Sequence, residues 1–284
     1  MRRTFSRLFL FLGLIGLALL AWAYRTAIAD PVVRETRVPL PGLAPGSKPL
    51  RALLISDIHV AGPDMTPERL ARIVVRANRL EPDVVLIAGD LVGDKGLSTH
   101  IYTVPEMVAP LGGLRSRLGT FAVLGNHDHW RNEQEVKVAL REREITVLDN
   151  EAAQAGPLAI GGLDDAFTDH ADLPGLLREL DRLPGARLIL SHSPDPFPDM
   201  PSGIGLMLAG HTHCGQINLP FHSSVSHVSR YGDRYACGRI EEEGKVLIVG
   251  AGLGTSVLPL RLGAVPDIWL VTLVPPQASS STSQ

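Results

Sequence analysis

Two short polar clusters, each directly after an apolar run, constrain this chain more than any other feature of its 284 residues. The two clusters are Gly125-Asn126-His127-Asp128, after the run 120–124, and Gly210-His211-Thr212-His213, after the run 205–209. Apolar runs of this length that end at glycine are typical of buried strands. Each cluster is therefore predicted to follow the carboxyl end of a strand, which is where open α/β sheets bind their ligands.

Three further predicted strands end in the same way. The run 53–56 leads into Asp57 and His59, the run 84–88 into Gly89 and Asp90, and the run 187–191 into His192. A single cluster such as Gly89-Asp90 could be an ordinary turn, since aspartate is common in turns. All five together present aspartate, asparagine and histidine but no thiolate, and this oxygen and imidazole set suits Mn, Fe or Zn ions. The pattern therefore favours a metal site.

Length and composition limit the class of protein. A chain of 284 residues can bury one sizeable core, and 45% hydrophobic with 20% charged residues is typical of a globular protein. The formal net charge is −3 and no basic run stands out, so nucleic acid is not expected as a partner. The oligomeric state is left open.

Residues 1–29 are predicted to be a membrane anchor or a signal segment. Arg2, Arg3 and Arg7 precede the run 8–23, which carries no charge. As a helix this run is about 24 Å long, just short of the ~30 Å hydrocarbon core of a bilayer. The arginines favour a cytoplasmic N-terminus and a catalytic domain outside the cytoplasm. Ala27-Ile28-Ala29 has the form of a signal cleavage site, so export after cleavage is the alternative.

The remaining chain is predicted to form one domain, residues 50–275. Residues 30–49 hold five prolines and are expected to be a linker or a first irregular strand, and residues 276–284 a disordered tail. Helices are predicted at 67–80, 132–143 and 173–183, and further strands at 145–148, 157–160, 235–240, 245–249 and 267–273. Cys214 and Cys237 are too few for a disulfide framework. They can pair if the domain is exported, or remain two unpaired small residues.

The five clusters, in this order and spacing, resemble the motifs of the calcineurin-like metallophosphoesterase family. The similarity covers roughly residues 50–273 and includes the segment 252–256 with Pro259 and Arg261. This last segment is similar to a membrane-associated or exported bacterial branch, which includes phosphodiesterases and enzymes that cleave the pyrophosphate of a lipid A precursor. Arg261 suits a phosphate oxygen, or else it is an ordinary surface arginine.

The resemblance implies an α/β fold, a four-layer αββα sandwich of the metallophosphoesterase type behind the N-terminal hydrophobic helix. It also implies two divalent metal ions (Mn, Fe or Zn) at one edge of the two sheets. The implied ligands are Asp57, His59 and His213 for one ion, Asn126, His192 and His211 for the other, and Asp90 as the bridge. His127 is expected to assist the leaving group, with Asp128 orienting its ring.

The predicted function is metal-dependent hydrolysis of phosphoester bonds, as a phosphodiesterase or as a pyrophosphatase on a lipid-linked or cell-envelope substrate. The substrate is expected to be a phosphorylated small molecule or a lipid-linked compound. A hydroxide shared by the two ions is expected to attack phosphorus in line. The alternative is a non-catalytic metal-binding scaffold that keeps the fold. Such a chain should lack ligands or the catalytic histidine, whereas here every position is filled, which favours the enzyme.

Overall fold

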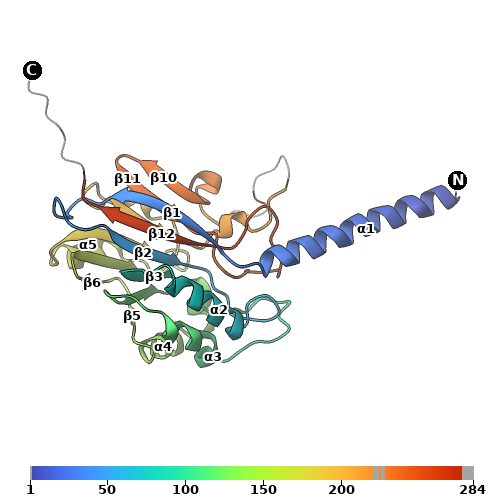
Figure 1. Cartoon of the computed structure of the whole chain (residues 1–284), viewed down its shortest axis with the longest axis horizontal. Coiled ribbons are helices and arrows are strands. Elements are labelled where there is room, and N and C mark those ends of the chain that lie inside the picture. The colour runs from blue at the N-terminus through green and yellow to red at the C-terminus, as the bar shows by residue number, and fades with distance from the viewer. Residues whose placement is uncertain (1, 220–223, 225–227, 277–284) are drawn as a thin grey trace, which may run out of the picture.

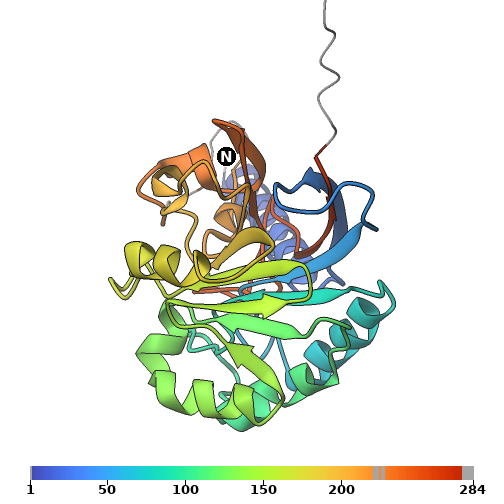
Figure 2. The same cartoon turned by 90° about the vertical axis from the view of Figure 1, so that its left-hand side faces the viewer.

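The fold rests on two sheets that pack face to face (Figures 1 and 2). The structure is a computed structural model that describes residues 2–219, 224 and 228–276. The first sheet has the strand order β1-β12-β2-β3-β4-β5. Its strands are β1 (Val32–Pro39), β2 (Leu50–Ile55), β3 (Val84–Ala88), β4 (Thr120–Val123), β5 (Ile145–Val147) and β12 (Asp267–Val274).

The second sheet has the strand order β10-β11-β9-β8-β7-β6. Its strands are β6 (Glu151–Ala155), β7 (Leu158–Leu163), β8 (Ala186–Ser191), β9 (Leu206–Ala209), β10 (Gly238–Glu242) and β11 (Lys245–Val249). The inner faces share one core, in which Leu54 and Leu86 of the first sheet meet Leu188 and Leu208 of the second. The central strands β3, β8 and β9 are buried on both faces, because each sheet is covered on its outer side as well.

Helices form the two outer layers (Figure 2). Against the first sheet lie α2 (Pro67–Asn78), α3 (Val104–Val108) and α4 (Asn126–Arg141), and against the second lies α5 (Leu173–Leu180). Short 3₁₀ turns are η1 (Ala109–Gly113), η2 (Phe197–Asp199), η3 (His213–Gly215) and η4 (Gly232–Tyr235). The order helix, sheet, sheet, helix confirms the predicted αββα sandwich.

Several element boundaries differ from the sequence prediction, which also lacked strand β6. Helix α4 begins at Asn126 and not at residue 132, because Asn132 is a non-helical kink that separates a first turn from the predicted helix. Strand β10 begins at Gly238, after the 3₁₀ turn η4, and not at residue 235. Helix α2 begins as expected, with Thr66 Oγ1 accepting a hydrogen bond from the amide of Arg69.

The segment 30–49 contains a regular strand. All eight residues of β1 pair in parallel with β12, from Val32 opposite Asp267 to Pro39 opposite Val274. The first-strand alternative is therefore the one that the structure contains. The predicted tail, residues 276–284, lies outside the described residues except for Pro276.

Helix α1 (Arg2–Ala27) extends away from the sandwich as a single rod (Figure 1). Within the described residues, Phe5–Ala27 is long and apolar enough to cross a membrane. Its large side chains are exposed along most of its length, and only Ala23 and Ala27 near its end are buried against the domain. The apolar surface of α1 therefore does not pack into the core of the domain.

Cys214 and Cys237 form a disulfide bond, and both cysteines of the chain are thereby used. Of the two alternatives left open by the sequence, pairing is the one found. The bond joins η3, which carries His213, to the start of β10.

Candidate active site

All seven predicted metal ligands meet at one edge of the sandwich. They follow the carboxyl ends of β2, β3 and β4 in the first sheet and of β8 and β9 in the second. Each of them is buried: Asp57, His59, Asp90, Asn126, His192, His211 and His213. Because parallel strands end at the same edge, residues up to 156 positions apart in sequence, Asp57 and His213, become neighbours.

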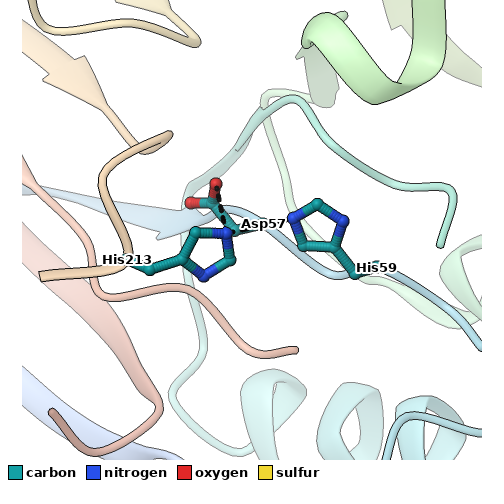
Figure 3. Close-up of side chains that lie close together, drawn as sticks. All are labelled: Asp57, His59 and His213. Atoms are coloured by element: carbon teal, nitrogen blue, oxygen red, sulfur yellow. Dashed lines mark hydrogen bonds and ion pairs between the residues drawn. The ribbon is translucent and has the colours of Figure 1, made fainter. Parts of the chain in front are cut away.

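A first group consists of Asp57, His59 and His213 (Figure 3). The Nε2 atoms of His59 and His213 lie 3.1 Å apart, and His213 Nε2 lies 3.6 Å from Asp57 Oδ1. One potential ligand atom from each residue lies within 4.8 Å of the others. This spacing allows all three side chains to reach a common point.

A second group consists of Asp90, His192 and His211, with Asn126 beside it. His192 Nε2 lies 3.2 Å from Asn126 Oδ1 and 3.1 Å from His211 Nδ1. Asp90 Oδ2 lies 3.2 Å from His192 Nε2 and 3.4 Å from His59 Nε2, so one carboxylate contacts both groups.

Several buried polar atoms here have no hydrogen-bond partner among the described residues, namely Asp57 Oδ2, His59 Nδ1 and His211 Nε2. Buried polar groups are nearly always paired, and each exception calls for a physical reason. A cation held by oxygen and imidazole donors would supply that reason, and the donor set fits Mn, Fe or Zn.

The protonation states of the histidines also fit a cation. Burial lowers the pKa of His59 to about 3 and that of His211 to about 4, so both rings are neutral at pH 7 and carry a lone pair. Burial also lowers the pKa of His192, but the adjacent Asp90 outweighs it and raises that pKa well above its usual value. A divalent ion would take the place of that proton, because imidazole binds metal in its neutral form.

The backbone holds several of these residues in an uncommon conformation. Positive φ angles occur at Asp57, His59, Asp90, His211 and His213. Non-glycine residues avoid this region because of Cβ clashes, and such strain persists mainly at functional sites. A Cβ on Gly125 would collide with the Asp90 carboxylate, which explains glycine directly before the Asn-His-Asp cluster.

His127 lies at the mouth of the site, but its partner differs from the predicted one. Its Nδ1 atom is 2.5 Å from Asp94 Oδ1, and its ring centroid is 4.7 Å from that of His59. Burial lowers the pKa of His127, but the hydrogen bond to Asp94 and the negative charges of Asp90 and Asp94 together outweigh burial, so the pKa is raised.

Asp128 does not contact the ring of His127 and instead holds the backbone. Its carboxylate accepts hydrogen bonds from the amides of Leu91, Val92 and Gly125. The expected orienting role of Asp128 is therefore wrong on geometry, because its oxygens face the turn that carries Asp90. Sequence analysis missed Asp94; its only signal is a carboxylate four residues after Asp90, on the same loop.

Arg261 neither lies on the surface nor reaches the cavity. Its side chain is fully buried, and its guanidinium donates to the carbonyls of Ala251, Gly252 and Gly254. A surface position is therefore excluded, and the guanidinium also lies 3.4 Å from Nδ1 of His213. Arg261 holds the loop that passes behind Asp57 and His59.

A cavity of about 360 Å³ opens over the two groups. Polar side chains of the site, including Asp90, Asn126 and His127, form its floor. Its walls are apolar: Trp130 and Phe167 stand on one side, and Ile217, Val257 and Leu258 are among the remaining lining residues. The ring centroid of Trp130 lies 4.9 Å from that of His127, and that of Phe167 lies 4.7 Å from that of His211. A phosphate at the floor would therefore have its organic substituents against apolar surface.

Comparison with known proteins agrees with this geometry. Residues 50–215 match the family described as Calcineurin-like phosphoesterase. An uncharacterized metallophosphoesterase of Helicobacter pylori is 32% identical over 96% of this chain and 71% of its own length. One from Bacillus subtilis is 32% identical over 77% of each chain. A bovine transmembrane protein with a metallophosphoesterase domain is 30% identical over 85% of this chain and 57% of its own length.

Proposed function

This chain belongs to the calcineurin-like metallophosphoesterase family and is a phosphoester hydrolase, and from that premise we propose a more specific activity. The protein is a membrane-anchored enzyme that uses two divalent ions to cleave a phosphodiester or pyrophosphate bond in a lipid-linked or cell-envelope substrate. One observation carries the proposal: a single carboxylate, that of Asp90, contacts both groups of buried ligand residues.

The ligand roles follow from the two groups. Asp57, His59 and His213 would hold one ion, Asn126, His192 and His211 the other, and Asp90 both. Ions bound there would neutralise charge on the phosphoryl oxygens and lower the pKa of an attacking water.

His127 supplies the proton that the leaving oxygen needs. Asp94 binds the ring at Nδ1, which directs Nε2 and its proton away from that carboxylate. The raised pKa keeps a larger fraction of His127 protonated near neutral pH, as a general acid requires. Asp94 acts here as a positioning residue.

The cavity walls support a substrate with an organic group on both sides of the phosphate. Trp130 is 57% exposed and Phe167 is 46% exposed, although both are large apolar side chains next to the site. Exposed aromatic groups beside a polar floor are typical of pockets that bind amphiphilic ligands.

The disulfide bond supports a catalytic domain outside the cytoplasm. Disulfides persist in oxidising compartments and are rare in the cytosol. The Cys214–Cys237 bond therefore agrees with the orientation that the arginines before α1 favour.

A substrate panel tests the proposal. Purified full-length protein in detergent, loaded with Mn, is assayed on nitrophenyl phosphate, bis-nitrophenyl phosphate and a lipid-linked pyrophosphate. We expect the diester or the pyrophosphate to be cleaved with the highest kcat/KM and a chelator to abolish the activity. A clear preference for the monoester would contradict the proposal, and the Asp90→Ala variant serves as the inactive control.

A further inference from the structure

The direction of the strands places the active site on the same edge of the sandwich as the end of α1. Strand β1 begins at Val32, shortly after α1 ends at Ala27, and β12 runs parallel to β1. Strand β2 is antiparallel to β12, so its carboxyl end points back toward α1, and β3 and β4 run parallel to β2. Figure 1 shows the helix leaving the domain from this edge.

A direct contact joins the helix to the loop that supplies part of the cavity wall. The amide of Arg261 donates a 3.0 Å hydrogen bond to the carbonyl of Ala23, which lies inside the apolar segment Phe5–Ala27. Ser256, Val257 and Leu258, a few residues earlier on the same loop, line the cavity. The part of the cavity wall that this loop forms therefore lies beside the last turns of α1.

The surface at this level is apolar. We define the apolar rim as Ile217, Leu219, Val228, Val257 and Leu258. Val257 is 69% exposed, Leu219 45% and Val228 37%, a degree of exposure that single apolar residues show but a cluster rarely does.

The loop that carries Val257 and Leu258 has no exposed charge, although Arg230 is exposed near Val228, in a different segment of the rim. In the segment 250–266 the only charged side chain is Arg261, which is fully buried. Trp22 is exposed on the last turns of α1, and tryptophan is enriched where a helix crosses the boundary between lipid and water.

We propose that the apolar rim inserts into the surface of the same bilayer that α1 crosses, so that the active-site cavity opens at the lipid boundary. This inference rests on the proposed membrane anchoring and on no feature of the catalytic chemistry. The loop that carries Val257 and Leu258 is joined to α1 through Arg261 and Ala23, and lipid is the one partner that must be present beside that helix. A phosphoester amphiphile can then bring its phosphate to the cavity floor while its chains remain in lipid.

Spin labelling measures this contact. The two native cysteines are bonded to each other, so a single label can be attached to Val257→Cys, or separately to Leu219→Cys, in full-length protein. Val138→Cys is the matched control, because Val138 is 52% exposed and lies near the far end of α4. The proteins are placed in phosphatidylcholine and phosphatidylglycerol vesicles, and label accessibility is measured with oxygen, which partitions into lipid, and with a water-soluble nickel chelate.

We expect both rim labels to favour oxygen over the nickel chelate severalfold more than the label at residue 138. Rim labels with the accessibility of the control would overturn the inference. Hydrolysis of bis-nitrophenyl phosphate by the wild-type protein is measured in the same vesicles. Rim labels in lipid without hydrolysis would contradict the proposed function alone, whereas hydrolysis with rim labels in water would contradict the inference alone.

Discussion

At the scale of single residues, a variant of His127 can distinguish a role in catalysis from a role in metal binding. His127 lies next to Asn126 in the chain, but its Nδ1 atom is hydrogen-bonded to Asp94. Its Nε2 atom therefore remains available to protonate the leaving group. We expect His127→Gln to keep its bound metal and a nearly unchanged KM while kcat falls by roughly 10²–10⁴, the usual contribution of a general acid. Steady-state kinetics with elemental analysis measures both quantities.

Substrates with different leaving groups provide the control for the His127→Gln variant. Nitrophenolate is a good leaving group that needs little protonation, so the loss of kcat should be smaller on nitrophenyl esters than on alkyl diesters. A wild-type kcat on an alkyl diester would refute the assignment. Loss of metal in the variant would instead make His127 a ligand or a structural support.

Asp90 is expected to matter for both ions at once. Its Oδ2 atom contacts His59 of the first group and His192 of the second. The Asp90→Ala variant should therefore lose metal from both positions, as measured by elemental analysis of purified protein against wild type. Two ions per chain in this variant would show that Asp90 is not shared.

His129 gives a pH-dependent contribution to stability away from the ligands. Its Nε2 atom is 2.9 Å from Asp164 Oδ1 and its Nδ1 atom is 2.8 Å from Glu133 Oε2. Burial lowers the pKa of His129, but the hydrogen bond to Asp164 and the two negative charges outweigh burial, so the pKa is raised. A raised histidine pKa means that the charged pairing stabilises the fold below the unfolded pKa of ~6.5 and is lost as pH rises through the folded pKa.

The His129→Gln variant tests that sign. Its free energy of unfolding, measured with urea at a series of pH values, should differ most from wild type below about pH 6.5 and less at alkaline pH. A difference that grows with rising pH would mean that His129 is neutral in the fold.

The convergence of the seven candidate ligand residues could be predicted from sequence, whereas the partner of His127 could not. Each candidate ligand residue follows an apolar run, and such a run predicts a buried strand. The residues that follow the carboxyl ends of neighbouring strands lie close together. Asp94 and Asp128 both lie near His127 in the chain or the fold, and which one faces the ring depends on how two loops pack. Asp128 is taken by three backbone amides, a non-local fact that no spacing reveals.

At the scale of elements, the disulfide bond should stabilise the loop that carries His213. It closes a loop with a sequence separation of 23, which in the chain-entropy treatment corresponds to about 3 kcal/mol. A Cys214→Ser, Cys237→Ser double variant should lose that amount in urea unfolding and should also release metal more readily, because Cys214 follows His213. A reductant should destabilise wild type and leave the double variant unchanged; equal responses would contradict this role.

The same scale shows which elements were predictable. Strands β3 and β9 are apolar throughout and β2, β4 and β8 are mostly apolar, so all five could be recognised from composition alone. Strand β1 could not, because it lies among prolines, carries three charged residues, and is half exposed at the edge of the sheet. What makes it a strand is β12, more than 220 residues later in the chain.

At the scale of the whole molecule, α1 predicts where the protein is found. In a bacterial host we expect the full-length chain to sediment with membranes, to resist carbonate extraction and to dissolve in detergent, because Phe5–Ala27 can span the bilayer. Protease added outside the inner membrane should digest the domain while a cytoplasmic control protein stays intact.

Two other outcomes of the fractionation have distinct meanings. A soluble exported chain that begins near residue 30 would show that residues 1–29 are a cleaved signal segment and not a membrane anchor. A soluble cytoplasmic chain with an intact N-terminus would contradict both.

The short connection between α1 and β1 has a mechanical consequence. Only residues 28–31 separate the helix from a strand that is paired along its whole length, and Arg69 and Arg76 bind Ala29 and Asp30 within that connection. A pull on the domain is therefore borne in shear by the β1–β12 ladder, with almost no slack to take up first. If α1 spans the membrane as proposed, the domain cannot swing outward on a flexible linker, and the height of the active site above the membrane is fixed. Under that proposal, the enzyme would select substrates by the height of the phosphate above the membrane, independently of any contact with side chains in the cavity.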